Sequence, residues 1–221
     1  MKPQPPPPLT APVPRRDDLA CVVQDADMSS PSPGMSGDVL NATRHFIKAL
    51  EDEKIPHALV GGLAVLQYVD GRNTRDIDLI IATEDLSRLP DFFLEEQNEW
   101  FATGMSGPLR VDLLFTANPL FAEVLTHHSV ARDFLGARLN CATPHGIILL
   151  KLFALPSLYR QGNIDRAALY ETDILQLLHH HPAAPDALLH TLASHMPPSD
   201  INALRAVLTD IQSRLTHANR F

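Results

Sequence analysis

One short segment constrains the fold of this 221-residue chain more than any other. Residues 76–81 read Asp-Ile-Asp-Leu-Ile-Ile, a pattern that alternates acidic and apolar residues and then becomes continuously apolar. Such a pattern predicts a buried central strand. Because side chains alternate between the two faces of a strand, Asp76 and Asp78 must point to the same side while Ile77 and Leu79 enter the core.

Two carboxylates on one face of a buried strand need a compensating group. At about 4 Å and an effective dielectric constant near 20, two like charges repel each other by roughly 4 kcal/mol. A divalent cation, a shared proton or solvent between Asp76 and Asp78 relieves this repulsion, and the cation does so most readily. The alternative is a pair of solvated acids on an edge strand, which the apolar continuation of the segment disfavours.

A second apolar segment carries a third acid. Residues 109–115 read Leu-Arg-Val-Asp-Leu-Leu-Phe and predict a strand in which Asp112 faces away from Val111 and Leu113. If this strand lies beside residues 76–81, Asp112 joins the acidic pair. Three carboxylates supply enough oxygen ligands for one or two Mg²⁺ ions, whose remaining positions hold waters and substrate phosphates.

A glycine pair precedes the acidic strand. Residues 58–60 predict a short buried strand that runs into Gly61 and Gly62, followed by a helix over residues 63–68. Glycine permits close approach at such a turn, and a helix start there presents backbone N–H groups to a phosphate. The alternative is that the two glycines only allow a tight turn in the core.

The rest of the chain predicts mainly helices. Thr143 and Pro144 form a helix start signal, with Thr143 as N-cap and Pro144 in the first helical position. The expected fold class is therefore α+β, with a small mixed sheet flanked by helices and followed by a C-terminal helical region. The further expected elements are helices over 38–54, 84–97, 164–180, 185–195 and 199–217, and a short strand at 99–101.

Three regions are expected along the chain. Nine of the first 33 residues are proline, and such a tract adopts polyproline II without a packed core. We therefore expect residues 1–37 to be a disordered extension, either an unstructured leader or a docking tail. Residues 38–141 are expected to form the core with the acids, and residues 142–221 the helical region.

Composition and spacing exclude several functions. The net charge is −8 and the isoelectric point is near 5.7, so a broad basic face for nucleic acid is not expected. Cys21 and Cys141 have no paired spacing, which excludes a disulfide scaffold and a cysteine zinc site. The three histidines at 179–181 point about 100° apart on a helix and cannot share one ion. With no span-length apolar run and no signal-type segment, we expect a soluble cytoplasmic protein that does not contact membranes.

The spaced motifs resemble a known superfamily. The order is Val60-Gly61-Gly62, thirteen residues, Asp76-Ile77-Asp78-Leu79, and later Val111-Asp112-Leu113. This order is similar to the nucleotidyltransferase superfamily with the polymerase-beta-like fold. Residues 59–81 are most similar to the AbiEii-type toxin-like nucleotidyltransferases.

The resemblance implies roles for these residues. It implies that Asp76 and Asp78 hold the metals that bind a triphosphate, and that Asp112 holds the catalytic metal and assists deprotonation of the attacking hydroxyl. The implied cofactor is Mg²⁺ and the implied substrate is an NTP. Arg72 and Arg75 are surface ion-pair residues in the alternative interpretation, and Lys151 a snorkelling side chain. The implied nucleotide-binding residues are Gly61, Gly62, Arg72, Arg75 and Lys151.

One motif departs from the resemblance. The toxin-like families carry Lys and Asp ahead of a later Asp; here Leu169 and Tyr170 stand in those places and only Asp173 is kept, as a possible additional site residue. The first hypothesis is a Mg²⁺-dependent nucleotidyltransferase acting on tRNA, protein or a small molecule such as an aminoglycoside. A toxin-like enzyme would also have an antitoxin partner. The second hypothesis is a catalytically silent nucleotide-binding or interaction module.

Overall fold

A computed structural model describes residues 37–70, 74, 76–89 and 91–218 of the chain. The extension expected over residues 1–37 lies outside the described residues, apart from Gly37, which begins the first described helix. Arg72 and Arg75 lie outside them as well.

The described residues form one seven-stranded mixed sheet in the order β3-β4-β5-β2-β1-β7-β6. The middle of the sheet combines both orientations, because β2 pairs in parallel with β5 and antiparallel with β1, and β1 pairs in parallel with β7. The strands are β1 (His57–Val60), β2 (Ile77–Ile81), β3 (Phe92–Gln97), β4 (Phe101–Ser106), β5 (Leu109–Phe115), β6 (Ser129–Phe134) and β7 (Ala137–Ala142).

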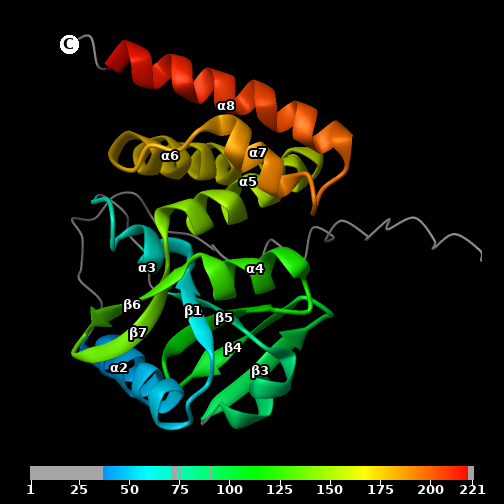
Figure 1. The fold of residues 1–221 in the computed structure, drawn as a ribbon. Helices are drawn as coiled ribbons and strands as arrows, with labels where there is room; N and C mark the ends of the chain where they lie inside the picture. Colours follow the sequence, from blue (N-terminus) through cyan, green and yellow to red (C-terminus); the bar gives the residue numbers. More distant parts are fainter. Residues whose placement is uncertain (1–36, 71–73, 75, 90, 219–221) are drawn as a thin grey trace, which may run out of the picture.

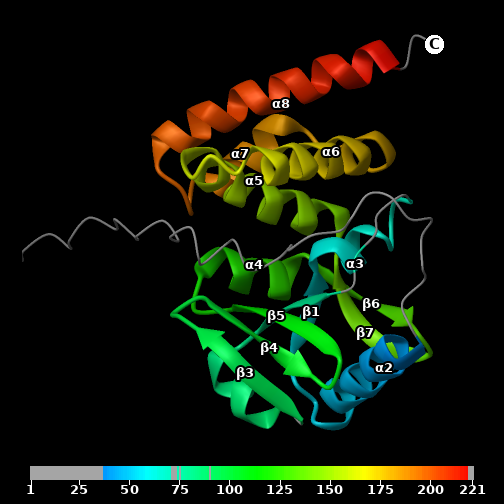
Figure 2. The same ribbon diagram turned by 180° about the vertical axis from the view of Figure 1, so that it is seen from behind.

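Helices cover the sheet on one side and form a separate layer beyond one of its ends. In Figures 1 and 2, α3 and α4 lie between the sheet and α5, while α6, α7 and α8 stack further out and α2 lies at the opposite end of the molecule. This α+β arrangement confirms the fold class that the sequence predicts. None of the described helices has the length and apolar character to cross a membrane. The helices are α2 (Gly37–Asp52), α3 (Gly61–Val65), α4 (Pro119–His127), α5 (Pro144–Arg160), α6 (Ile164–His180), α7 (Pro185–Leu192) and α8 (Pro198–Ala218), with a 3-10 helix, η1, at Thr83–Arg88.

The acidic strand is central and buried, as its apolar continuation predicts. All five residues of β2 are buried, and Ile77, Leu79 and Ile80 are completely inaccessible to solvent. Each fully buried aliphatic side chain contributes roughly 1.5–3 kcal/mol relative to an exposed one. The strand that carries Asp78 is therefore held rigidly by the core around it.

The helical layer begins where the sequence predicts. The Thr143 hydroxyl accepts a hydrogen bond from the Gly146 backbone N–H at 3.2 Å, and Pro144 occupies the first turn of α5. This capping satisfies an N–H group that would otherwise lack a partner at the helix start. Helix α5 is buried along most of its length, and it packs against α6 and α8.

The helix predicted over residues 84–97 is wrong. This segment contains the short 3-10 helix η1 and then strand β3, which pairs antiparallel with β4. The sequence carries Pro90 in its middle, and a proline excludes the preceding residue from helical conformation; Leu89 is accordingly extended, with φ −70° and ψ 115°. Of the short strand expected at 99–101, only Phe101 lies in a strand, as the first residue of β4.

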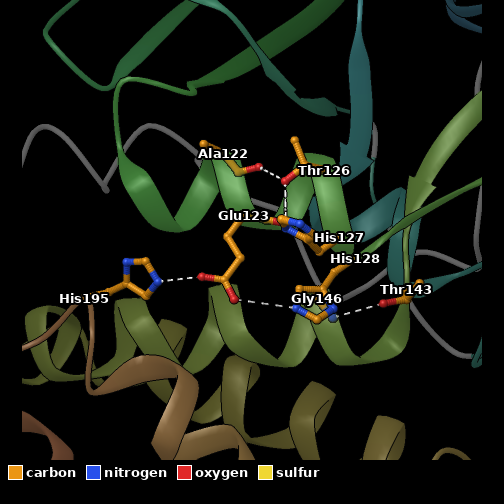
Figure 3. A network of polar contacts seen from close by, with 8 residues as sticks. All are labelled: Ala122, Glu123, Thr126, His127, His128, Thr143, Gly146 and His195. Atoms are coloured by element: carbon orange, nitrogen blue, oxygen red, sulfur yellow. Dashed lines mark hydrogen bonds and ion pairs between the residues drawn. The ribbon is translucent and has the colours of Figure 1, made fainter.

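A polar network ties the sheet to the helical layer (Figure 3). Glu123 of α4 contacts His195, between α7 and α8, with Oε2 2.8 Å from Nε2, and its Oε1 lies 3.9 Å from His128 Nε2. The His128 ring packs on His145 at the start of α5, with 4.8 Å between the ring centroids. Burial lowers the pKa of both His128 and His145, which favours the neutral imidazoles. Residues from three separate segments thus fix α4 against α5 and the later helices.

Candidate active site

Two of the three predicted acids are direct neighbours in the sheet. Strands β2 and β5 pair in parallel with Asp78 opposite Asp112, which is the adjacency that the sequence analysis required. Both residues are buried, Asp78 at 7% and Asp112 at 4% exposure. Asp76 immediately precedes β2 and is half-buried, and its negative charge raises the pKa of both other acids. The three acids therefore form one electrostatic unit.

Asp112 is the more strongly perturbed acid. Burial, followed by repulsion from Asp78, raises the pKa of Asp112 to about 8, although the Arg110 guanidinium opposes the shift with Nε 3.4 Å from Oδ1. Both carboxylate oxygens are shielded from solvent and accept no hydrogen bond from the described residues. A buried carboxylate without hydrogen-bond donors is costly to ionise. Asp112 is therefore protonated at pH 7 unless additional positive charge reaches it.

Asp78 has a milder environment. Burial and repulsion from Asp76 raise its pKa to about 6, while the charges of Lys151 and Arg166 and a hydrogen bond from the Gly62 backbone oppose the rise. At pH 7 Asp78 is mainly ionised beside a protonated Asp112. The two strands therefore hold a pair of carboxyl groups whose second negative charge depends on a cation.

The glycine pair allows the backbone to approach Asp78 closely. Gly61 starts the five-residue helix α3 directly after β1 and has a φ of +64°, a conformation that favours glycine. A Cβ atom at Gly61 would lie 1.9 Å from Asp78 Oδ2, and one at Gly62 would lie 2.9 Å from the Thr74 side chain. Close contacts therefore require glycine at both positions, and at Gly61 the contact is with the Asp78 carboxylate.

The helical layer contributes a buried ion pair. Lys151 Nζ of α5 lies 2.8 Å from Asp173 Oδ2 of α6, and the two side chains are only 6% and 1% exposed. Lys151 and Asp173 were predicted as separate site residues, and the packing of α5 on α6 brings them together. Tyr170, one turn before Asp173, places its ring centroid 4.1 Å from Lys151 Nζ. The tyrosine that departs from the resembled motif therefore contacts the lysine.

Two arginines at this site were not among the predicted residues. Arg110 lies two residues before Asp112 on the same face of β5, so strand alternation alone places them together. Arg166 lies one helical turn before Tyr170 on α6 and acts electrostatically on both Asp78 and Asp112. The helical spacing from Arg166 through Tyr170 to Asp173 was a signal that could have indicated a shared helix face.

The acids offer oxygen atoms of the kind that divalent cations prefer. Within the described ranges, no three His, Cys, Asp or Glu side chains are gathered as a metal site. Mg²⁺, however, is usually held by one or two carboxylates together with substrate phosphates and waters. The two buried oxygens of Asp112 that accept no hydrogen bond are hard donors of this type. His179 to His181 are exposed at the end of α6, the solvated position that their spacing indicates.

Comparison with known proteins supports the fold. No protein-family model matches the chain, and the search of curated proteins found no match. The solution structure of the antibiotic-resistance factor ANT(2'')-Ia is similar with a TM-score of 0.52 and 15% identity, over 84% of this chain and 99% of that one. An antigenic nucleotidyltransferase-like protein from Paracoccidioides brasiliensis gives 0.49 and 18%, over 79% and 95%. A crystal structure of ANT(2'')-Ia in complex with adenylyl-2''-tobramycin gives 0.49 and 16%, over 79% and 98%.

Replacing Asp112 by Asn should stabilise the protein at alkaline pH. The pKa of Asp112 is 3.8 in the unfolded chain and is raised to about 8 in the folded protein, so the folded protein binds this proton more tightly. The protonated acid therefore stabilises the fold fully below pH 3.8, and this stabilisation is lost as the pH rises toward about 8. Asp112→Asn removes this loss. We expect its free energy of unfolding to exceed that of the wild type by about 1–3 kcal/mol at pH 8 and to match it near pH 4.

Urea unfolding at both pH values measures this difference. Asp210→Asn is the matched control, because Asp210 is exposed on α8 and undergoes the same chemical change. A stability advantage of Asp112→Asn that is absent at pH 8, or equal at both pH values, would contradict the electrostatic account.

Gly61→Ala tests the close contact between Gly61 and the Asp78 carboxylate, and Gly107→Ala is its control. Both glycines have a left-handed φ, +64° and +58°, but a Cβ at Gly107 meets nothing within 4 Å. Gly107→Ala should therefore cost only the backbone term, about 1 kcal/mol. Gly61→Ala should cost at least about 2 kcal/mol more, because the new methyl group overlaps the Asp78 carboxylate. Equal destabilisation of the two variants in urea unfolding would contradict the prediction, because it would show that the contact with Asp78 adds nothing to the backbone cost.

Proposed function

We propose that this chain is a nucleotidyltransferase. In the proposed reaction a nucleoside monophosphate passes from an NTP to a hydroxyl or phosphate group of an acceptor, and pyrophosphate is released. The observation that carries the proposal is the register of β2 and β5, which places Asp78 beside Asp112 in the buried centre of the sheet. The fold similarity to ANT(2'')-Ia supports the same class.

The proposed ligands of Mg²⁺ are Asp78 and Asp112, with Asp76 beside them. Bound there, Mg²⁺ would supply the positive charge that neutralises the triphosphate and makes ionisation of both carboxylates favourable. Gly61 and Gly62 fix the Asp78 carboxylate and are proposed to lie along the nucleotide. Arg72 and Arg75, on the segment before the acids, are proposed to neutralise phosphate charge, and Lys151 to add positive charge at Asp78.

Asp112 is the proposed proton acceptor. A group that accepts a proton in the reaction works best when its pKa lies near the working pH. Without a cation, burial and Asp78 raise the pKa of Asp112 to about 8; a bound Mg²⁺ would lower it from that value, while burial keeps it above that of an ordinary ligand carboxylate. Once ionised, Asp112 can take the proton of the attacking hydroxyl while Asp78 stays charged.

We propose two alternative acceptor classes, a small molecule and a macromolecule. The net charge of −8 suits a cationic small molecule or a basic protein better than a long nucleic acid. The fold similarity to the antibiotic-resistance factor ANT(2'')-Ia favours the small-molecule alternative. A toxin-like activity on tRNA or protein, with an antitoxin partner, rests on the sequence resemblance alone.

A pyrophosphate-release assay tests the proposal. Purified full-length protein is supplied with Mg²⁺, each of the four NTPs, and separate acceptor pools of tRNA, protein and aminoglycosides. We expect release with at least one pool, and a loss of about 100-fold or more in Asp78→Asn and Asp112→Asn, because both carboxylates act in the transition state. The control variant Asp210→Asn should keep wild-type activity.

Two results would contradict the proposal. Mg²⁺-dependent release that persists in both acid variants would remove the site assignment. Binding of Mg²⁺-NTP without release for every acceptor would favour the catalytically silent nucleotide-binding module.

A further inference from the structure

One carboxylate lies among three imidazoles where the helical layer meets α4 (Figure 3). Glu123 Oε2 is 2.8 Å from His195 Nε2, and the other oxygen of Glu123 is 3.9 Å from His128 Nε2. The ring of His145 lies 4.8 Å from that of His128, centroid to centroid, with 31° between the ring planes. We name these four residues the Glu123 cluster. The proposed transfer reaction uses none of them.

The end of α4 and the start of α5 are in close contact around the Glu123 cluster. The Thr143 backbone N–H donates a hydrogen bond to the His128 carbonyl oxygen at 2.8 Å. A Cβ atom added at Gly146, in the first turn of α5, would lie 2.9 Å from both the Cβ and the carbonyl oxygen of His128. The His195 side chain, from the connection between α7 and α8, is only 10% exposed. The cluster therefore joins three segments at a tightly packed contact.

The charge of the cluster depends on the protonation of its imidazoles. Among the described residues, the titratable groups that act on the His128 ring are Glu123, His145 and the exposed His127, while Glu123 acts on His145. One carboxylate can neutralise one imidazolium, and Glu123 already contacts His195. If His128 and His145 were both protonated, two like charges would face each other across the stacked rings and repel.

Both stacked rings favour the neutral form. Burial lowers the pKa of His128, and the neighbouring His145 lowers it further; burial also lowers the pKa of His145. Glu123 opposes both shifts without cancelling them. Lowered pKa values mean that the closed cluster is fully favoured above the ordinary value of 6.5 and loses this advantage as the pH falls below it. Acid therefore favours separation of the rings.

We propose that the Glu123 cluster is an acid-sensitive contact, which holds the start of α5 against α4 at neutral pH and releases it when the imidazoles are protonated. The effect reaches the candidate site, because α5 carries Lys151, whose Nζ lies 2.8 Å from Asp173 Oδ2 of α6. Since α5 packs on α6 and α8, a shift of α5 moves the helical layer relative to the sheet. The inference concerns the fold and does not depend on the proposed function.

Amide hydrogen exchange in the full-length protein tests the contact without requiring turnover. The amides of residues 146–150 are compared at pH 7.5 and 5.5, after correction for the intrinsic exchange rate. An imidazole that is neutral in the closed cluster and titrates near pH 6.5 after separation raises the opening equilibrium by about tenfold over this interval. We therefore expect protection at the start of α5 to fall by about tenfold or more at pH 5.5, while the amides of β2 keep theirs.

A double variant tests whether the imidazoles cause this response. His128→Gln/His145→Gln removes both titrations and keeps polar side chains, so its protection at the start of α5 should change by less than about twofold. The matched control is His190→Gln, because His190 is exposed on α7, and it should respond to acid as the wild type does. Asp78 and Asp112 also bind protons as the pH falls, but both are present in every variant and cancel in the comparison.

Three results would overturn the inference. They are a wild-type change below about twofold at the start of α5, an equal acid response in the double variant, and a loss of protection in β2 as large as that in α5, which would indicate global unfolding. If the double variant fails to fold, NMR titration of the ring protons in the wild type decides. Titration of His128 and His145 below pH 6.5 would then support the inference, and titration at or above it would overturn it. Because no outcome involves transfer activity, the proposed function can fail separately.

Discussion

The burial of two neighbouring carboxyl groups is the constraint on which the rest of the site depends. The parallel register of β2 and β5 fixes Asp78 beside Asp112, and the apolar core around both strands prevents either from moving into solvent. Burial raises the pKa of Asp78 to about 6, with repulsion from Asp76 added, and burial raises the pKa of Asp112 to about 8, with repulsion from Asp78 added. Ionising both acids in this position would lower the free energy of unfolding, and nearby positive charge would offset that cost.

The surrounding elements place compensating groups around the two acids, some from the sheet and some from the helical layer. From the sheet, the turn at Gly61 closes on Asp78, and Arg110 lies 3.4 Å from Asp112. From the helical layer, Lys151 and Arg166 lower the pKa of Asp78. The network from Glu123 to His195 ties that layer to α4 and so to the sheet (Figure 3). The site is therefore assembled from both parts of the chain, although its acids come from the sheet alone.

Strand periodicity identified the acids of the candidate site, but their adjacency depended on the pairing of β2 with β5. Alternation placed Asp76 and Asp78 on one face, and the isolated acid at Asp112 indicated a second functional strand before any pairing was known. The pattern did not reveal β6 and β7. Strand β6 is largely exposed at the sheet edge and lacks a clear apolar face. It also could not reveal the pair of Lys151 and Asp173, since contacts between helices depend on tertiary packing.

The central claim is that, at pH 7, the second negative charge of the acid pair appears when a cation binds. It is tested most directly by proton release when Mg²⁺ and a non-hydrolysable NTP analogue bind at pH 7, measured by calorimetry in buffers of different ionisation enthalpy. The account predicts release of about one proton per complex, from the Asp112 carboxyl group, and none in Asp112→Asn. Binding to the wild type without proton release, or equal release in Asp112→Asn, would contradict it.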